Sequence, residues 1–321
     1  MQFYFAPMEG VTGYIYRNAH NTFFHNIDKY FTPFIEPQQN GKYKTKQMKD
    51  ILPENNRGLV VIPQILTNKA HHFINSSKEI KQLGYNEINL NLGCPSGTVV
   101  SKHKGSGFLS QREELERFLD EIFSASITKI SVKTRIGIEQ PDEFYKLIEI
   151  FNKFPMEELI IHPRLQKDYY KNKPNMVIFK EALALSKNPV CYNGDIFTAD
   201  DYKKFLDEYS SVNTIMLGRG LIANPGLINE FSNNNVLDKQ RLKDFHDLVC
   251  QDYQKVLSGD VNVLYKMKEL WFYMIHMFTN HEKYAKKIKK SQRLGDYQEV
   301  VARLFSEQEL IEGSGFLTLN K

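Results

Sequence analysis

The chain has few cysteines, no long apolar run and no excess of charge of one sign. Its three cysteines, Cys94, Cys191 and Cys250, are spaced for neither a disulfide framework nor a zinc site. The odd number suits a reducing compartment. No apolar stretch approaches the ~18 residues that cross a bilayer, and the start at Met1 lacks the features of a signal peptide. These absences predict a cytoplasmic protein with no membrane segment and no metal site.

Composition otherwise describes an ordinary globular protein, with 41% hydrophobic and 25% charged residues in 321 positions. That length suits one barrel of about 250 residues plus an appendage. The net charge of +4 is too small to indicate nucleic-acid binding by itself. One segment is different, since Lys283–Arg293 holds six basic residues and no acidic one. It predicts either a solvated helix face or a surface for an anionic partner.

Short β-rich apolar runs alternate with helical patterns along the first two thirds of the chain. The predicted strands start near Phe3, Phe31, Leu59, Glu87, Lys129, Glu158, Pro189 and Thr214. Most intervals are close to one βα unit, and caps such as Ser110 with Glu113 and Thr198 with Asp201 mark helix starts. Eight such units predict a (β/α)8 barrel, and a doubly wound open sheet is the alternative.

The last third of the chain reads as helical. Ser232–Asn235 is a polar break, and only a weak strand pattern at Phe316–Leu319 follows it. The predicted helices cover 241–257, 263–280, 282–290 and 297–305. We therefore predict a barrel domain at residues 1–235 and an all-α bundle at residues 236–321.

A lone cysteine follows the predicted strand 87–92. Glycines and a proline in Gly93-Cys-Pro-Ser-Gly97 end the strand and place Cys94 on a turn. In α/β folds the carboxyl ends of strands carry the chemistry. The position thus favours a functional thiol, and a structural cysteine is the alternative.

Polar residues follow most of the predicted strands. In a barrel they would converge on one mouth and form a site for a large polar cofactor. Lys133 within strand 129–135 would need an anionic partner, such as reduced flavin, although a Schiff-base lysine is possible. Gln64 offers a donor and an acceptor to the far edge of such a ring. His162 remains open between base, phosphate contact and metal ligand, but no second ligand supports metal.

Two glycine loops follow the seventh and eighth strands, Asn193-Gly194-Asp195 and Gly218-Arg219-Gly220. In barrels these loops commonly hold a phosphate, because glycines let backbone N–H groups approach an anion closely. Arg219 would add charge. The alternative is that these glycines only make tight turns.

Six segments resemble the bacterial-type tRNA-dihydrouridine synthases, which are FMN-dependent flavoenzymes with a barrel followed by a helical domain. The segments are Ala6–Thr12, Asn91–Pro95, Val132–Arg135, His162–Arg164, Tyr192–Ile196 and Met216–Gly220, in the order of the family. Asn-x-Gly-Cys-Pro is the most specific of these motifs. Pro163 departs from the small residue expected there, which puts the backbone around Arg164 in doubt.

The resemblance implies a role for each matching residue. Cys94 is the implied proton donor, Asn91 lies near flavin and target base, and Arg135 and Arg164 line the substrate side. NADPH or NADH is the implied hydride donor. The residues implied to hold FMN are Pro7, Met8, Gln64, Lys133, His162, Asn193, Gly194, Asp195, Gly218 and Arg219.

The implied reaction agrees with the residues. Reduced FMN passes hydride to C6 of a uracil, and an acid that is protonated near neutrality must then protonate C5. A thiol with an ordinary pKa of about 8.5 meets that need. The target uridine must leave its RNA stack to reach the flavin. The alternatives are a flavin barrel acting on a small molecule, as in the dihydroorotate dehydrogenase or old yellow enzyme families, a non-catalytic RNA-binding protein, and a lysine-dependent aldolase.

The expected macromolecular partner is tRNA. Lys286, Lys287, Lys289 and Lys290 in the basic run are the predicted contacts of the helical domain. Further basic residues follow predicted strands two, four and six. The protein is expected to act as a monomer, while the target uridine, the nicotinamide preference and the oligomeric state are not fixed by the sequence.

Overall fold

The computed structural model describes residues 1–37, 43–231 and 237–316. Within these ranges nine parallel strands form one nearly closed barrel, in the order β3-β2-β1-β9-β8-β7-β6-β5-β4. The predicted (β/α)8 barrel is confirmed. The strands are β1 (Gln2–Phe5), β2 (Lys29–Phe31), β3 (Val61–Ile62), β4 (Gln64–Ile65), β5 (Glu87–Leu92), β6 (Lys129–Arg135), β7 (Leu159–His162), β8 (Val190–Tyr192) and β9 (Thr214–Leu217).

The strand predicted near Leu59 is divided at Pro63 into β3 and β4. Proline has no N–H to donate to the ladder, so pairing is interrupted there. β3 pairs with β2 and β4 pairs with β5, which makes this divided strand the link between the two ends of the sheet. The extra strand therefore leaves the eightfold plan intact.

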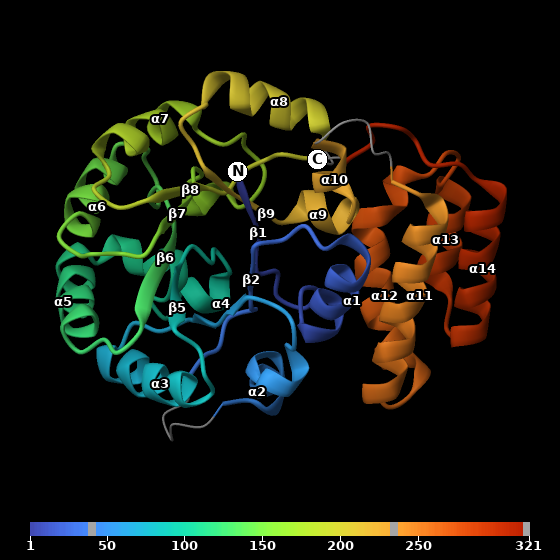
Figure 1. Ribbon diagram of the computed structural model, residues 1–321, viewed down its shortest axis with the longest axis horizontal. Helices are drawn as coiled ribbons and strands as arrows, with labels where there is room; N and C mark the ends of the chain where they lie inside the picture. Colours follow the sequence, from blue (N-terminus) through green and yellow to red (C-terminus); the bar gives the residue numbers. More distant parts are fainter. Residues whose placement is uncertain (38–42, 232–236, 317–321) are drawn as a thin grey trace. The chain divides into compact units, whose positions relative to one another are not determined.

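Contacts within the chain define two compact units, and the first holds most of the barrel. It comprises residues 1–7, 28–195 and 209–216. Its helices α3, α5, α6 and α7 lie outside the strands (Figure 1). A core of Tyr4, Phe31, Ile160, Cys191 and Met216 packs together, and Cys191 is fully buried, as predicted. The helices of this unit are α2 (Thr45–Ile51), α3 (Ala70–Gln82), α4 (Gly97–Val100), α5 (Arg112–Ser124), α6 (Glu143–Phe151) and α7 (Met176–Leu185), with 3-10 helices Pro53–Asn55, Gly105–Ser110 and Gln166–Asp168.

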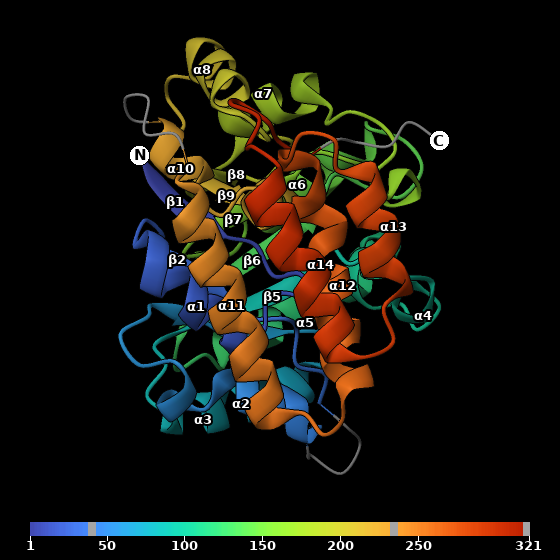
Figure 2. The same ribbon diagram turned by 90° about the vertical axis from the view of Figure 1, so that its right-hand side faces the viewer.

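The second unit comprises residues 8–27, 196–208 and 217–321, of which 232–236 and 317–321 lie outside the described residues. Helices α11 to α14 lie side by side in it (Figure 2). The break at Ser232–Asn235 and most of the weak strand at 316–319 fall outside the description, and the boundary at residue 235 stays a prediction. The helices of this unit are α1 (Tyr14–Phe24), α8 (Ala199–Glu208), α9 (Arg219–Ala223), α10 (Leu227–Phe231), α11 (Lys239–Val256), α12 (Asp260–Met274), α13 (Glu282–Lys290) and α14 (Leu294–Glu307), with a 3-10 helix Ile275–Met277.

An aromatic cluster and a polar network hold the second unit together. Phe245 of α11 packs edge-on against Tyr16 and Phe24 of α1, with ring centroids 5.4 and 5.6 Å apart. The buried hydroxyl of Tyr297 accepts a hydrogen bond from Trp271 at 2.7 Å and lies 2.5 Å from Nε2 of His246. The core of this unit thus includes α1, which precedes the barrel's second strand.

Of the two predicted capping boxes, one is confirmed and one is wrong. Thr198 and Asp201 exchange hydrogen bonds, Asp201 N to Thr198 Oγ1 at 3.1 Å and Thr198 N to Asp201 Oδ2 at 3.0 Å. Ser110 does not cap α5, because it ends a 3-10 helix and its hydroxyl donates to the carbonyl of Gly107. The N-cap of α5 is Gln111 instead, and no side chain makes a capping hydrogen bond there.

Two kinds of feature are absent from the described ranges. No helix there is long and apolar enough to span a membrane. No group of three His, Cys, Asp or Glu side chains is arranged to hold a metal ion within the same ranges. The predicted absence of a metal stays a prediction.

A carboxyl group is buried at the end of the barrel where the strands begin. Glu158 immediately precedes β7 and is 5% exposed. Burial and the nearby Glu87 raise the pKa of Glu158 to about 7, although Lys29, which is paired with Glu87 at 2.7 Å, opposes the shift. The native state therefore retains a proton that the unfolded chain releases near its ordinary pKa.

We expect the Glu158→Gln variant to gain stability relative to wild type as pH rises from about 4.5 to 7. Ionising Glu158 destabilises the native state, so the difference is absent below the ordinary pKa and complete above the raised one. The gain should be on the order of 3 kcal/mol, measured by urea unfolding at several pH values. The neighbouring Glu157→Gln is the control, since Glu157 is paired with the exposed Lys129. A Glu158→Gln difference that is independent of pH would contradict the assignment.

Candidate active site

The predicted strand-end residues of the first unit lie on adjacent strands. Asn91 of β5 is in register with Lys133 of β6, and Arg135 of β6 is in register with His162 of β7. Gln64 lies in β4 and pairs with Asn89 of β5. The parallel register therefore gathers these side chains at the carboxyl ends of four consecutive strands, as the sequence pattern predicts.

A chain of buried amides runs across β4, β5 and β6. Gln64 Nε2 donates to Asn89 Oδ1 at 2.8 Å, and Gln64 Oε1 accepts from Asn91 Nδ2 at 2.7 Å. Asn89 Nδ2 donates in turn to Ser131 Oγ at 3.0 Å. Each amide is fixed in orientation by its neighbours. The sequence did not indicate Asn89 or Ser131, although alternation places both on the same strand face as their partners.

The turn that carries Cys94 is held from two sides. Asn91 Oδ1 accepts hydrogen bonds from the backbone N–H groups of Gly93 and Cys94, at 3.0 and 2.9 Å. The carbonyl of Cys94 accepts from Ser106, from N at 3.0 Å and from Oγ at 2.8 Å. Gly105 has a φ of +55°, and a Cβ there would lie 2.8 Å from the Cys94 carbonyl oxygen. The partly exposed thiol therefore stands on a fixed backbone.

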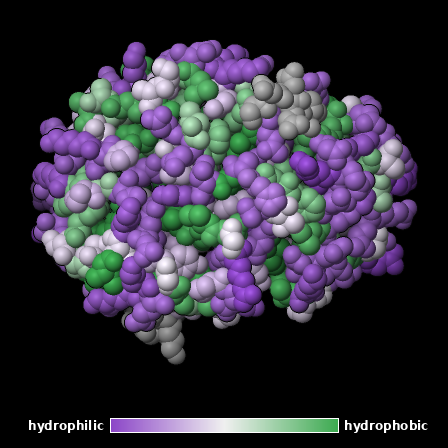
Figure 3. All heavy atoms as spheres, viewed as in Figure 1, coloured by the Kyte–Doolittle hydropathy of each residue, from purple (hydrophilic) through white to green (hydrophobic). Residues whose placement is uncertain are grey.

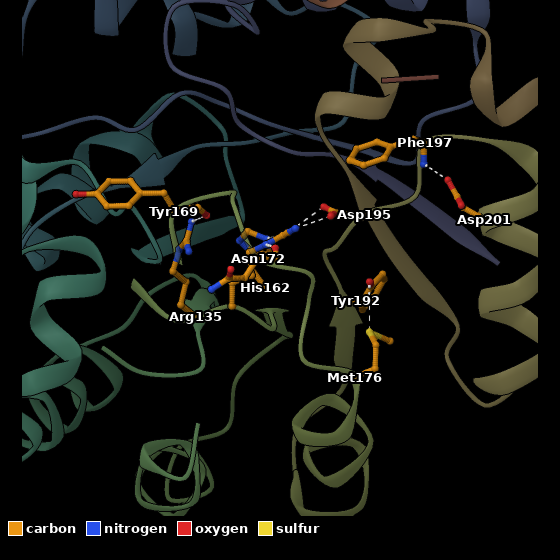
Figure 4. Close-up of polar contacts among 10 residues, drawn as sticks. Arg135, His162, Tyr169, Asn172, Met176, Tyr192, Asp195, Phe197 and Asp201 are labelled. Atoms are coloured by element: carbon orange, nitrogen blue, oxygen red, sulfur yellow. Dashed lines mark hydrogen bonds and ion pairs between the residues drawn. The ribbon is translucent and has the colours of Figure 1, made fainter. Parts of the chain in front are cut away.

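Arg135 ties the Cys94 turn to the loop after β7. Its guanidinium is 1% exposed and donates to the carbonyls of Gly93, Leu165 and Tyr169, at 3.0, 2.7 and 2.8 Å. The contact with Tyr169 is drawn in Figure 4. Burial lowers the pKa of Arg135. These bonds give it a supporting role, and its predicted place on the substrate side stays a prediction.

Arg164 is also buried and binds Asp195. Its Nη1 donates to Asp195 Oδ1 at 2.8 Å, its Nη2 makes a second bond to the same carboxylate, and Nε donates to the Asn172 carbonyl at 2.6 Å. Figure 4 draws the two bonds to Asp195 as dashed lines. Arg164 was predicted on the substrate side and Asp195 at the cofactor. The structure joins these two residues to each other, and both roles stay predictions.

Arg164 also contacts the ring of His162 and thereby indicates which ring nitrogen carries the proton. Arg164 Nη1 lies 2.9 Å from His162 Nε2. A guanidinium can only donate, so Nε2 accepts and the neutral ring carries its proton on Nδ1. The backbone around Pro163 is a tight turn, because Arg164 N donates to the carbonyl of His162 at 2.7 Å. Proline's fixed φ suits the central position of such a turn, so Pro163 directs Arg164 back toward His162.

Lys133 differs from the other cations of this site. Among the residues that the structure describes, none accepts a hydrogen bond or forms an ion pair with its ammonium group. Burial, together with the charge of Arg135, lowers the pKa of Lys133 to about 8. A partly buried ammonium without an acceptor favours an anionic ligand. The chemistry of this position therefore fits a flavin whose reduced form carries negative charge.

The loop after β8 contains Asn193 and Gly194. Asn193 Nδ2 donates to the carbonyl of Met216 at 2.8 Å. A Cβ on Gly194 would lie 2.0 Å from the hydroxyl oxygen of Tyr192, so a larger residue would have to displace the buried Tyr192 ring. Packing against Tyr192 thus explains this glycine without a ligand. The predicted approach of its N–H to a phosphate stays a prediction.

The remaining predicted cofactor residues lie around β1 and β9. Pro7, in the first unit, is partly exposed. In the second unit, the N–H of Met8 donates to Thr12 Oγ1 at 2.8 Å. Gly218 precedes α9, and Arg219 begins that helix with its guanidinium over two phenylalanine rings. Contacts of these four residues with a flavin stay predictions.

The basic run forms most of helix α13. Tyr284 and Ile288 are its buried residues, and Lys286, Lys287, Lys289 and Lys290 are exposed. No ion pair joins these four lysines to any acidic residue of the described chain. Hydrophilic residues predominate on the surface over α13 and α14 (Figure 3). The predicted patch is therefore accessible and not neutralised by its neighbours.

The barrel with this strand-end site places the protein in the class of (β/α)8 barrels. A solved structure described as "TcOYE with pHBA" has the same fold, with a TM-score of 0.53 and 9% identity over 80% of this chain and 96% of that one. The family model "Dihydrouridine synthase (Dus)" matches residues 4–315, so the chain belongs to the dihydrouridine synthase family. Members of this family are flavin-dependent oxidoreductases, and this protein is an enzyme of that kind.

Two curated relatives carry the family's activity in their names. "tRNA-dihydrouridine(16) synthase" of Pseudomonas putida is 29% identical over 235 residues, which cover 71% of this chain and 72% of the relative. "Probable tRNA-dihydrouridine synthase 2" of Bacillus subtilis is 27% identical over 259 residues, 76% of this chain and 78% of the relative. The resemblance read from the six motifs is confirmed. Reduction of uridine in tRNA is the general activity that these findings support.

Proposed function

We propose that this protein reduces specific uridines of tRNA to 5,6-dihydrouridine, with FMN as its flavin and NADPH or NADH as the reductant. The observation that carries the proposal is the ammonium of Lys133, which has no partner in the described chain and whose strand position is in register with Asn91, three residues before Cys94. The group that favours an anion thus lies on β6, next to β5, and the turn after β5 carries the proton source. Reduction of a pyrimidine by a flavin needs both groups, one to bind the reduced flavin and one to protonate the base.

The first unit offers several groups to the flavin. Lys133 would face the negative edge of the reduced ring. The Gln64 amide has one N–H and one oxygen lone pair beyond its bonds to Asn89 and Asn91, and these would meet the polar edge of the ring. His162 is a further residue that we propose for the flavin. When bound, the reduced flavin supplies the hydride that reaches C6 of the uracil. Gly194, Gly218 and Arg219 are the residues that we propose for its phosphate.

Cys94 supplies the proton that completes the reaction. Its S–H would protonate C5 of the uracil and leave a thiolate that regains its proton from water. Asn91 and Ser106 fix the backbone on both sides of the thiol. That support maintains the thiol's position while the base enters, which is the usual requirement for general acid catalysis.

We further propose that the exposed lysines of α13 bind phosphates of the tRNA. Four ammonium groups on one short helix, unpaired within the described chain, create a local positive potential that the small net charge does not reveal. The predictions that the protein is monomeric and cytoplasmic stay open.

The test is turnover with defined substrates. Purified protein should have the absorption spectrum of a flavin and, with NADPH, should convert unmodified tRNA to a product containing dihydrouridine. Free uracil and orotate should not be reduced. A colourless protein would instead favour the aldolase alternative, and reduction of orotate a small-molecule oxidoreductase. Binding of tRNA without turnover would favour the non-catalytic alternative.

Replacing Lys133 with methionine should weaken FMN binding by about 10- to 100-fold, the usual value of a charge-assisted contact. Because the anionic reduced flavin needs the protonated amine, the affinity of the wild type for reduced FMN should also fall as pH rises above about 8, the lowered pKa of Lys133. The variant should lack this pH dependence. Anaerobic titrations of the flavin-free protein with pre-reduced FMN between pH 7 and 9.5 measure both effects.

Lys129→Met is the matched control for this experiment. Lys129 lies at the opposite end of the same strand and is paired with Glu157 at 2.8 Å. It should bind FMN like wild type. Equal losses in the two variants would mean that Lys133 acts only through the fold.

A further inference from the structure

The guanidinium of Arg219 lies against a pair of phenylalanine rings. Its Cζ is 5.2 Å from the ring centroid of Phe197 and 5.3 Å from that of Phe316. The two rings are themselves 5.4 Å apart and tilted by 59°. These three distances are nearly equal, so the rings pack together and present one aromatic surface to the guanidinium.

Phe197 is held in place by the start of α8. Its N–H donates to Asp201 Oδ2 at 3.0 Å, a contact drawn in Figure 4, and the next residue forms the capping box with the same aspartate. Beyond it in the chain, a Cβ on Gly220 would lie 2.4 Å from the carbonyl oxygen of Ile196. Close packing and hydrogen bonds thus fix the backbone of Phe197 relative to α9.

Phe316 comes from a segment nearly 100 residues beyond Arg219 in the chain. A Cβ on Gly315 would lie 2.2 Å from the carbonyl oxygen of Phe197, so only a glycine allows the two backbones to approach this closely. The ring of Phe316 also packs on Tyr273 of α12, with centroids 5.5 Å apart. Phe316 therefore joins the helical bundle to the residue that begins α9.

We propose that Phe316 is a positioning residue that holds Arg219 in the orientation in which it binds the FMN phosphate. The inference rests on the proposed function, in which Arg219 contacts that phosphate. A cation–π contact engages the face of a guanidinium, whereas a phosphate accepts hydrogen bonds from the N–H groups in its plane, so the two kinds of contact are compatible. Holding the long side chain before binding reduces the entropy that binding would otherwise lose.

The experiment compares FMN with riboflavin, which has the same ring but no phosphate. Flavin is removed from the full-length protein, and both ligands are titrated by fluorescence. Phe316→Leu should weaken FMN binding about 5- to 10-fold, the scale of one cation–π contact, and leave riboflavin binding unchanged. Gly315→Ala retains the ring but forces the segment away from Phe197, and it should have the same selective effect.

Two further variants complete the design. Phe123→Leu is the matched control, because Phe123 also packs on another ring, that of Phe154 at 5.4 Å, in the barrel unit. It should bind FMN like wild type. Arg219→Ala should abolish most of the preference for FMN over riboflavin. Thermal unfolding of each variant verifies that the fold is retained.

The outcomes separate the inference from the function on which it rests. Selective loss of FMN affinity in Phe316→Leu supports the inference. Equal loss of affinity for FMN and riboflavin in Phe316→Leu overturns the inference. Unchanged FMN affinity in Phe316→Leu, while Arg219→Ala loses its preference for FMN, also overturns it. Both outcomes leave the phosphate role of Arg219 intact. If Arg219→Ala keeps the preference for FMN, the proposed phosphate site itself is wrong.

Discussion

Replacing Cys94 with alanine is expected to slow dihydrouridine formation by 10² or more, the usual scale for a lost general acid. Flavin content and NADPH oxidation should remain nearly intact, because the turn is fixed through the backbone of Cys94 and the side chains of Asn91 and Ser106. Single-turnover reduction of unmodified tRNA by the pre-reduced protein measures the affected step directly.

Two other cysteine variants sharpen this experiment. Cys94→Ser maintains the shape of the side chain but offers a much weaker acid, so it should be nearly as slow as the alanine variant. Cys250 is buried in α11, and Cys250→Ala should turn over like wild type if it folds. Wild-type turnover by Cys94→Ala would show that the thiol is only structural.

Neutralising the four lysines of α13 should cause the second-largest effect, on tRNA binding. In a variant with Lys286, Lys287, Lys289 and Lys290 changed to glutamine, we expect affinity at low salt to fall by about 10²-fold. The plot of log affinity against log salt should flatten by up to about 0.9 for each phosphate that the variant no longer binds. Filter binding or fluorescence anisotropy across a salt series gives both values. NADPH oxidation without tRNA should not change.

The control variant removes the same number of positive charges from another part of the surface. Lys180, Lys187, Lys203 and Lys204 are exposed residues in or near α7 and α8. Their quadruple glutamine variant should bind tRNA with an affinity close to that of wild type, since only the general charge of the protein is reduced. If both variants weaken binding equally, net charge is responsible and α13 is not a specific tRNA-binding surface.

The barrel was predictable because its signals are local. Each strand is a short β-rich run, and parallel strands in register bring their carboxyl ends together, so residues such as Lys133 and Asn91 meet without further information. The capping box of Thr198 and Asp201 is likewise contained in four residues. The capping box predicted for Ser110 and Glu113 was wrong, because the same sequence signature occurs where a 3-10 helix occupies the turn before α5.

The support of the site was not predictable in the same way. Ser106 holds the Cys94 carbonyl from a 3-10 helix twelve residues away, and no periodicity marks that partner. The resemblance implies that Arg135 and Arg164 line the substrate side, but a sequence does not show whether an arginine is buried or exposed. Their hydrogen bonds to backbone carbonyls and to Asp195 depend on which loops lie next to them.

By itself, the sequence determined the eight βα units, the residues at the strand ends, the family and the basic helix, since each depends on neighbouring residues or on a repeated motif. Only the tertiary structure decided that α1 packs with Phe245 of α11 and that Phe316 packs on Arg219. These contacts join residues from about 100 to more than 200 positions apart. Close packing of side-chain shapes selects such pairs, and shape complementarity leaves no periodic mark in the chain.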